Sequence, residues 1–294
     1  MRKIFFIALI MFNISTLLEA HPFPTDEKLY EYCDKIDSKL QKELKNFPNE
    51  LTKDEKNNLK KETVSEDPTI VTFKKGEYLY VYSKNLKDLQ GIYKVNSKGE
   101  PDGAYKEFLS KNKFTVGYYG KNGFEGYLRQ YEDGKLIGIC SAYAGKLEGI
   151  RKIYYPNGKL REEFRYFDGL ENGKGTLYHK NGKIGAIQNF KDGVLHGELI
   201  EYYENGQLIA EGNYLNGKLE GISKMYYESG QLKSENSYKD NLLNGISKTY
   251  YENGQIKEEL NYKDGQVVQD NLETEIKDFC NIAYENDKLK LEFD

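Results

Sequence analysis

The sequence predicts a mainly β protein: an elongated antiparallel meander of repeated β-hairpins, about 24 residues per repeat, with short helical segments at both ends. Three observations support this. A unit of constant length recurs through the middle and the second half of the chain. Each unit carries two turn signals about a dozen residues apart. Proline is rare, with 6 copies, whereas tyrosine is abundant, with 26, which suits a thin sheet whose apolar surface comes from tyrosine rings.

Five segments align without a gap. They begin at Leu147, Glu171, Leu195, Leu219 and Leu243. The third position is always glycine: Gly149, Gly173, Gly197, Gly221 and Gly245. The eighth is always tyrosine: Tyr154, Tyr178, Tyr202, Tyr226 and Tyr250. The fourteenth is aliphatic: Leu160, Ile184, Leu208, Leu232 and Ile256. The twentieth is aromatic: Tyr166, Phe190, Tyr214, Tyr238 and Tyr262.

Each unit is predicted to be one hairpin. Its first turn is Asn-Gly in four units and Ser229-Gly230 in the fourth unit, and Asn-Gly favours a two-residue type I′ turn. Its second turn, such as Asp192-Gly193 or Asn216-Gly217, leads into the next unit.

A two-residue loop at Ser229-Gly230 predicts three cross-strand pairs. These are Tyr227 with Leu232, Met225 with Ser234, and Gly221 with Tyr238. Positions 9, 14 and 20 would then share an apolar face that the end helices partly cover. The ring of Tyr238 would cover the bare glycine, so that Gly221→Val would crowd it.

The position-8 tyrosines are the candidate binding residues. On the predicted register they form an exposed row on the opposite, mostly charged face. Tyrosine suits interfaces because it combines a large apolar ring with a polar tip. The alternative is that these rings only stack on neighbouring side chains and stabilise a thin sheet.

The pattern G-x-x-x-x-Y-Y-x-N-G-x-(L/I), followed by Y-x-(D/N)-G, resembles the MORN repeat and is most similar to its bacterial variant. The resemblance covers roughly residues 101–266, including two weaker copies at 101–123 and 124–146. It implies an elongated sheet of successive hairpins that serves as a protein- or lipid-binding scaffold. Some bacterial members are labelled antitoxins.

An export signal is predicted over residues 1–20. Arg2 and Lys3 supply a positive start, residues 4–11 form an unbroken apolar run, and Ala20 is a small residue at the expected cut. The mature chain would begin near His21 and lie in the periplasm, at the cell surface or in the medium. An uncleaved N-terminal membrane anchor is the alternative, although the run is short for a span.

The remaining segments flank the repeats. Residues 21–66 predict two helices, because apolar residues recur at helical spacing up to Pro48 and Thr52 with Glu55 forms a capping box. Residues 67–100 are expected to be degenerate leading strands. Residues 267–294 predict a helical cap for the open edge, with one apolar face made of Leu272, Ile276, Phe279 and Ala283.

No catalytic residue, cofactor or metal site is predicted. His179 replaces a repeat tyrosine, and His196 has no nearby Asp or Cys partner in a known catalytic pattern. No nucleophile elbow, phosphate loop or zinc-protease motif occurs. The three cysteines, Cys33, Cys140 and Cys280, form no C-x-x-C pair.

The predicted function is therefore an exported, non-enzymatic scaffold that binds another protein or an envelope component. An antitoxin-type protein that neutralises a partner toxin is an alternative, and a lipid-associated scaffold is a further one. The 43 basic residues against 47 acidic residues argue against a nucleic-acid partner and give little attraction to anionic lipids.

Overall fold

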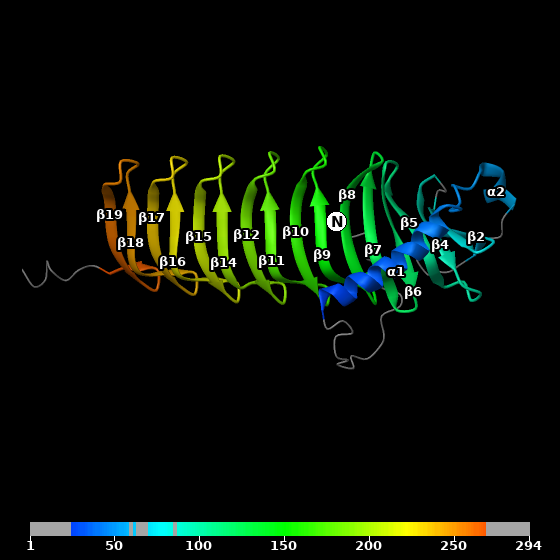
Figure 1. Cartoon of the computed structure of the whole chain (residues 1–294), viewed down its shortest axis with the longest axis horizontal. Helices are drawn as coiled ribbons and strands as arrows, with labels where there is room; N and C mark the ends of the chain where they lie inside the picture. Colours follow the sequence, from blue (N-terminus) through cyan, green and yellow to red (C-terminus); the bar gives the residue numbers. More distant parts are fainter. Residues whose placement is uncertain (1–24, 59–60, 63–69, 85–86, 269–294) are drawn as a thin grey trace, which may run out of the picture.

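The described chain is one long antiparallel sheet flanked by two helices (Figure 1). The computed structural model describes residues 25–58, 61–62, 70–84 and 87–268. The helices are α1 (Asp26–Leu44) and α2 (Lys53–Asn58). The predicted export signal, Cys280 and nearly all of the predicted C-terminal cap lie outside the described residues.

The strands follow one another as a meander in which consecutive strands pair, except that the two short strands Val194–Leu195 and Gly197–Tyr202 both pair with the strand before them. The leading strands are β1 (Lys61–Glu62), β2 (Ile70–Lys75), β3 (Tyr78–Ser83), β4 (Leu89–Val95), β5 (Pro101–Ser110), β6 (Lys113–Gly120), β7 (Gly123–Glu132) and β8 (Lys135–Tyr143). The five in-phase repeats form β9 (Lys146–Tyr154), β10 (Leu160–Phe167), β11 (Leu170–Tyr178), β12 (Ile184–Lys191), β13 (Val194–Leu195), β14 (Gly197–Tyr202), β15 (Leu208–Leu215), β16 (Lys218–Tyr226), β17 (Leu232–Lys239), β18 (Leu242–Tyr250), β19 (Ile256–Lys263) and β20 (Gln266–Val267). The predicted mainly β hairpin meander is confirmed.

The type I′ conformation predicted for the first turn of each repeat occurs in the second turn instead. At the first turn of each repeat only the glycine has positive φ, as at Gly206 of an Asn-Gly turn (φ 97°) and at Gly230 of the Ser-Gly turn (φ 88°). The N–H of Gly230 bonds the carbonyl of Tyr227 at 2.8 Å, so this is a longer turn ending in a left-handed glycine. Both central residues have positive φ in the second turn instead, as in Asp192 (φ 51°) and Gly193 (φ 79°), which is the type I′ pattern.

The longer turn shifts the register by one residue beside it. Gly221 pairs with Tyr238 and Met225 with Ser234, as predicted, but Tyr226 rather than Tyr227 lies opposite Leu232. The predicted pair of positions 9 and 14 is therefore wrong. Because strand side chains alternate, the position-8 tyrosines and position-14 aliphatics share one face. We call it the tyrosine face, and the face carrying the position-20 aromatics the opposite face.

Position 9 ties each repeat to the next. The hydroxyl of Tyr155 donates to the backbone carbonyl of Tyr178 at 2.7 Å, and Tyr203 donates to Tyr226 at 3.1 Å. A ring nitrogen of His179 takes the same place, 2.7 Å from the carbonyl oxygen of Tyr202. These residues are therefore structural.

Helix α1 has the predicted amphipathic pattern. Its buried side chains are those of Leu29, Cys33, Ile36 and Leu40. The Oγ1 of Thr25 caps its N-terminus by accepting from the N–H of Lys28. The predicted capping box of α2 is also present: Thr52 N–H donates to Glu55 at 2.8 Å, and Glu55 N–H donates back to Thr52 at 3.2 Å.

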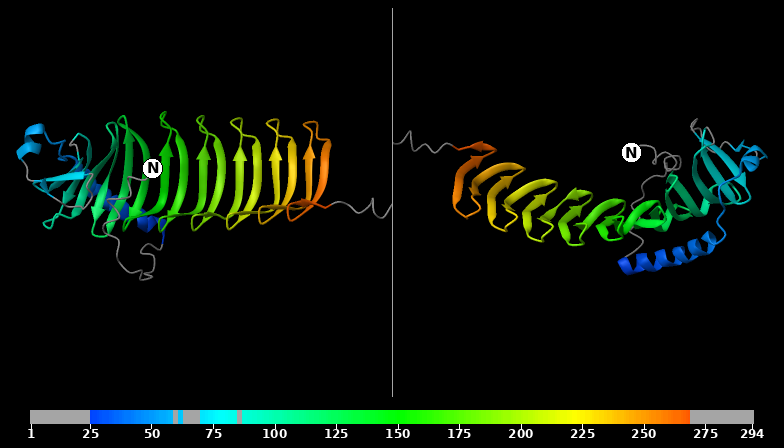
Figure 2. Two further views of the ribbon diagram at one scale, coloured as in Figure 1. Left: turned by 180° about the vertical axis from the view of Figure 1, so that it is seen from behind. Right: turned by 90° about the horizontal axis from the view of Figure 1, so that it is seen from above.

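Helix α1 lies on the tyrosine face, contrary to the prediction. Arg129, two residues before position 8 of its repeat, pairs with Asp37 of α1 at 2.5 Å, and Arg165, on the same face of β10, pairs with Asp26. Seen edge-on, the sheet is bowed and α1 runs along its convex side, below β9 to β5 (Figure 2). Beyond β10 no described helix covers either face.

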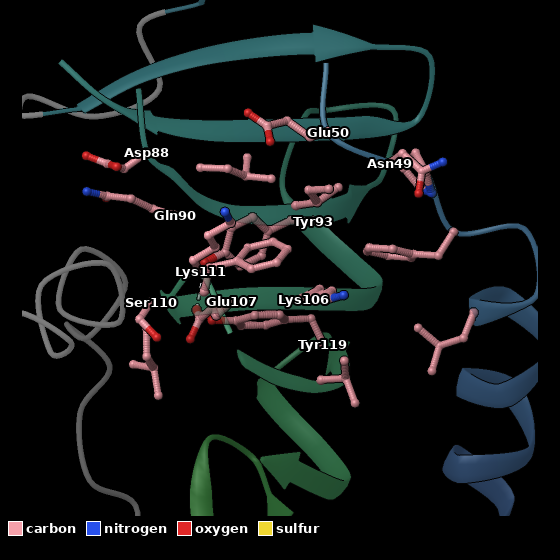
Figure 3. A pocket seen from close by; sticks show the side chains of 18 of the residues that line it. Asn49, Glu50, Asp88, Gln90, Tyr93, Lys106, Glu107, Ser110, Lys111 and Tyr119 are labelled. Carbon is pink, nitrogen blue, oxygen red and sulfur yellow. Dashed lines mark hydrogen bonds between the residues drawn. The ribbon is translucent and has the colours of Figure 1, made fainter. Parts of the chain in front are cut away.

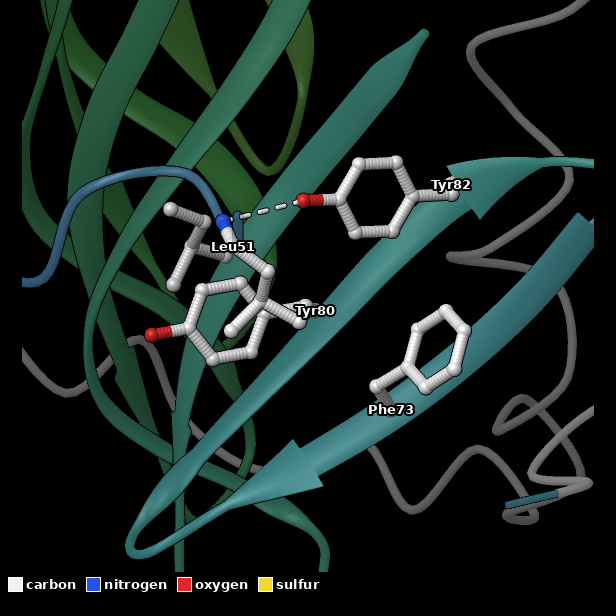
Figure 4. Packing of buried hydrophobic residues seen from close by; sticks show 5 residues of the cluster. Leu51, Phe73, Tyr80 and Tyr82 are labelled. Carbon is white, nitrogen blue, oxygen red and sulfur yellow. Dashed lines mark hydrogen bonds between the residues drawn. The ribbon is translucent and has the colours of Figure 1, made fainter. Parts of the chain in front are cut away.

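The thickest core lies at the N-terminal end of the sheet. On the tyrosine face, Leu51 packs with Phe73, Tyr80 and Tyr82, and its N–H donates to the Tyr82 hydroxyl at 3.2 Å (Figure 4). On the opposite face, a second cluster contains Leu79, Val81, Tyr93, Val95 and Tyr105. The later hairpins have few buried side chains, so they depend on contacts with their neighbours.

Position 3 requires glycine because its backbone has a positive φ. Gly221 has φ 75°, and a Cβ added there would meet no described atom within 4 Å. The pairing with Tyr238 was predicted correctly, but the predicted crowding of that ring was wrong. Glycine is favoured because a side chain strains this left-handed conformation.

Candidate functional site

The five position-8 tyrosines form one row along the edge of the sheet with the Asn-Gly turns. Each pairs with the position-14 aliphatic of its own hairpin, as Tyr202 does with Leu208 and Tyr250 with Ile256. Tyrosine and aliphatic side chains therefore alternate from β9 to β19, and we call this the tyrosine–aliphatic row. The tyrosine rings are half-buried rather than freely exposed.

The best-anchored ring of the row is that of Tyr226. Its hydroxyl donates to Glu211 of the preceding hairpin at 2.7 Å. Burial, together with this hydrogen bond, raises the pKa of Tyr226 to about 12. The ring of Tyr226 therefore has a packing role, and the binding role of the row stays a prediction.

Charge pairs run beside the row on the same face. Lys152 lies 3.2 Å from Glu163, Lys224 lies 3.4 Å from Glu235, and Lys248 lies 3.2 Å from Glu259. Each pair is neutral as a whole, so the row is bordered by both signs of charge without a net field. Such a border suits contact with a mixed polar surface more than with a polyanion.

The other predicted repeat residues are structural. Each position-3 glycine of the five repeats has positive φ. Of the position-20 aromatics, Tyr166 is buried and its hydroxyl donates to Glu171 at 2.8 Å, and the others are half-buried. Nδ1 of His196 lies 3.2 Å from the side-chain oxygen of Asn216 in the second turn of its repeat. The equivalent residues of other repeats, Asn172 and Glu220, also hydrogen-bond to the second turn.

A pocket of about 1250 Å³ lies where β4 and β5 diverge (Figure 3). The pairing of these strands stops at Gly91 and Glu107. Tyr93 and Glu107 point toward one another, and the tyrosine hydroxyl donates to the carboxylate at 2.6 Å. Burial raises the pKa of the Glu107 carboxyl, and the hydrogen bond from Tyr93 opposes that effect.

Sequence reasoning missed this pocket. The one signal in the sequence was Glu107, a charged residue two positions after Tyr105 in the same strand. Its neighbours on that face of the sheet are aromatic. The described lining of the pocket contains neither histidine nor cysteine. Among the described residues, no group of three or more side chains could hold a metal ion.

The described cysteines and helices add no further site. Cys33 and Cys140 are unpaired, and burial raises the pKa of the Cys33 thiol to about 12 and that of Cys140 to about 11. Such thiols are poor nucleophiles. Of the described helices, none has the length and apolar content needed to cross a membrane.

Comparison with known families agrees with the repeat geometry. The model of the MORN repeat variant matches at four places, residues 147–168, 195–216, 219–240 and 243–264. The copy at 171–192 lies in phase between the first two and pairs its strands in the same way. No curated protein sequence matches the chain. MORN repeats form non-catalytic scaffolds that generally bind proteins or membranes. Four of the five in-phase hairpins, at residues 147–168, 195–216, 219–240 and 243–264, are therefore repeats of the MORN variant type.

Proposed function

We propose that the protein is an exported scaffold that binds another protein through the tyrosine–aliphatic row. The observation that carries this proposal is the continuity of the row over five hairpins, with no described segment covering it beyond β10. Beside β9, helix α1 lies at the end of the strand with the type I′ turns, away from the Asn-Gly turns (Figure 1).

The chemistry of the row supports a protein partner. Half-buried tyrosines offer apolar area at little cost in side-chain entropy, together with a polar tip. Ile184 and Ile256, at position 14, are exposed beside them. Interface energy concentrates in a few such aromatic anchors, and paired charges at the rim provide orientation.

Export is supported by the sequence alone. The positive start and the apolar run of residues 1–20 are typical of a signal peptide. N-terminal sequencing of the native protein should find a chain that begins near His21. A soluble intracellular protein that retains Met1 would contradict export but leave the binding surface untouched.

Binding is tested with three variants of the mature chain. Tyr202→Ser, Tyr226→Ser and Tyr250→Ser are combined in the first, and Met225→Ser, an exposed change on the opposite face, is the matched control. The parent captures a partner from envelope extract, and the interaction is repeated with that partner purified. We expect the control to bind like the parent and the triple variant to bind at least about tenfold more weakly.

Stability is measured in parallel, because Tyr226 also bonds Glu211. A third variant, Tyr226→Phe, keeps the ring and removes only the hydroxyl, so it should bind nearly as well as the parent. Equal binding by a folded triple variant would refute the proposed surface.

A further inference from the structure

Aromatic rings form one wall of the pocket between β4 and β5, on the opposite face of the sheet. We call four of them, from neighbouring strands, the aromatic cluster: Tyr93 of β4, Tyr105 of β5, Tyr119 of β6 and Phe124 of β7. The ring centroids of Tyr119 and Phe124 are 4.4 Å apart. Those of Tyr105 and Tyr93 lie 5.0 Å and 6.0 Å from that of Tyr119. Tyr93, Tyr119 and Phe124 line the pocket, so ring surface borders it directly.

Two glycines make room for these rings. A Cβ added at Gly91 would lie 2.6 Å from the ring of Tyr93, and one at Gly117 would lie 2.7 Å from the ring of Tyr105. Neither glycine has a positive φ, so space rather than backbone conformation requires glycine there. Gly91 also lies opposite Glu107 in the strand register, and its missing side chain lets the Tyr93 ring reach the Glu107 carboxylate.

The Glu107 carboxylate lies among the rings and keeps its negative charge available. Its Oε1 accepts from the Tyr93 hydroxyl at 2.6 Å, and among the described residues this is its one hydrogen bond. The neighbouring base, Lys106, extends to the tyrosine face, where its Nζ lies 3.9 Å from the centroid of the Phe114 ring. Lys106 therefore does not neutralise Glu107.

The hydroxyls around this carboxylate do not compete with it for a cation. Burial and the nearby Glu107 carboxylate raise the pKa of Tyr93, Tyr105 and Tyr119. The three hydroxyls therefore stay protonated at neutral pH, and Glu107 is the group among these rings that can carry a negative charge.

We propose that this pocket binds an organic ammonium ion, whose nitrogen lies between the Glu107 carboxylate and the aromatic cluster. Aromatic ring faces attract ammonium groups, and a carboxylate beside the rings adds to that attraction. Burying a carboxylate costs free energy unless an opposite charge offsets it, and the bound ammonium ion provides that charge. Calcium and magnesium ions prefer several oxygen ligands, so one carboxylate among rings favours an organic cation over a metal ion.

The size of the pocket indicates that the ligand carries more than its ammonium group. Its volume of about 1250 Å³ exceeds that of a small ammonium ion. Gln90 and Ser110 also line it and offer uncharged hydrogen-bonding groups to the rest of the ligand (Figure 3). The site lies away from the tyrosine–aliphatic row, which begins at β9, so the inference goes beyond the proposed function and does not depend on it.

Affinities for matched cationic and neutral probes test the site in the full chain. The cations are choline and butylammonium. Their neutral matches are dimethylbutanol, in which carbon replaces the choline nitrogen, and butanol. Ligand-observed NMR titrations are made at about pH 8, where more of the Glu107 carboxyl with its raised pKa is ionised. We expect the parent to bind at least one cation about tenfold or more tightly than its neutral match.

Glu107→Gln keeps the shape of the side chain and removes its charge. It should weaken binding of that cation by about tenfold and leave binding of the neutral match unchanged, which also shows that the pocket is intact. Glu252→Gln, at an exposed turn far along the array, is the matched control and should bind like the parent. The amide of Glu107→Gln can still accept from Tyr93, so this variant should remain folded.

Three results would overturn the inference. The first is equal binding of the cations and their neutral matches by the parent. The second is equal cation binding by the parent and Glu107→Gln. The third is the lack of saturable binding of either cation by the parent.

Discussion

The hydroxyl of Tyr227 donates a hydrogen bond to the backbone carbonyl of Tyr250, 23 residues further along the chain, at 2.7 Å. This bond joins one hairpin to the next at the edge of the sheet with the Asn-Gly turns. The same bond recurs in the earlier repeats, so the tyrosine hydroxyl at position 9 joins each hairpin to the next by a hydrogen bond.

Tyr227→Phe should therefore destabilise the array while preserving its shape. The ring remains, but the carbonyl of Tyr250 loses its side-chain partner, which costs about 0.5–1.5 kcal/mol for a typical hydrogen bond. Urea unfolding followed by circular dichroism measures this change. Tyr251→Phe is the control, because Tyr251 begins the last described turn and no described repeat follows it. Equal losses in both variants would contradict the linking role.

The fourth repeat carries a weaker turn that can be improved. In the third repeat, Asn205 accepts from the N–H of Gln207 at 2.8 Å and donates to the carbonyl of Glu228 in the next turn at 3.2 Å. Ser229 occupies this position in the fourth repeat, and its shorter side chain cannot make both bonds. Ser229→Asn should raise stability by about 0.5–1.5 kcal/mol, the usual net value of a hydrogen bond.

Thermal unfolding of three proteins checks this prediction. Ser229→Ala should unfold near the parent temperature, because the serine side chain contributes little to the turn. Ser229→Asn should unfold above both. An asparagine variant no more stable than the alanine variant would show that these turn contacts do not stabilise the array.

The pocket carboxylate gives a pH-dependent prediction. Burial raises the folded-state pKa of Glu107 above its unfolded value of about 4.3. The protonated Glu107 carboxyl therefore contributes to folding stability at pH values below the unfolded-state pKa. This contribution is lost as the pH rises from the unfolded-state pKa to the raised folded-state pKa. Glu107→Gln, which can still accept from Tyr93, should raise the unfolding midpoint at pH 7 and have little effect near pH 3.5.

Urea titrations at the two pH values measure the difference. Glu252→Gln, at an exposed turn residue, serves as the control and should change the midpoint little at either pH. A gain from Glu107→Gln that is as large at low pH as at neutral pH would show that the ionised carboxyl is not the cause.

The sequence predicted the repeat, the hairpins and both described helices, because these depend on local periodicity. The spacing of Leu29 and Cys33 suffices for α1, and Thr52 with Glu55 suffices for the start of α2. The cross-strand partner of Gly221 was also correct, since the number of residues between the turns constrains it.

The wrong predictions concern the face on which side chains lie, which a shift of one residue in strand register reverses. Asn-Gly was assigned to a type I′ turn, whereas the chain adds one residue to that turn and moves Tyr226 opposite Leu232. This change reverses which face carries position 14. The face chosen by α1 depends on contacts about 90 residues apart, such as Arg129 with Asp37, and no local pattern encodes them.

The last prediction separates the two roles of the position-3 glycine. Gly149 and Gly197 have φ values of 80° and 107°, so alanine at either site should cost about 1–2 kcal/mol for the left-handed conformation. Only Gly149 also lies under α1, where an added Cβ would lie 2.8 Å from Leu29 and 2.9 Å from Ser141. Overpacking there should add about 1–3 kcal/mol.

Gly149→Ala should therefore lose clearly more stability than Gly197→Ala in urea unfolding, and it alone should loosen α1. Hydrogen exchange of the amides from Leu29 to Leu40 reports that loosening directly, since these amides are protected while the helix stays docked. Gly197 is the suitable control because no described helix lies over β14, and an added Cβ there would meet only the side chain of Asn189. If both variants lose the same stability and α1 stays equally protected, then the glycine serves the backbone alone and does not seat the helix.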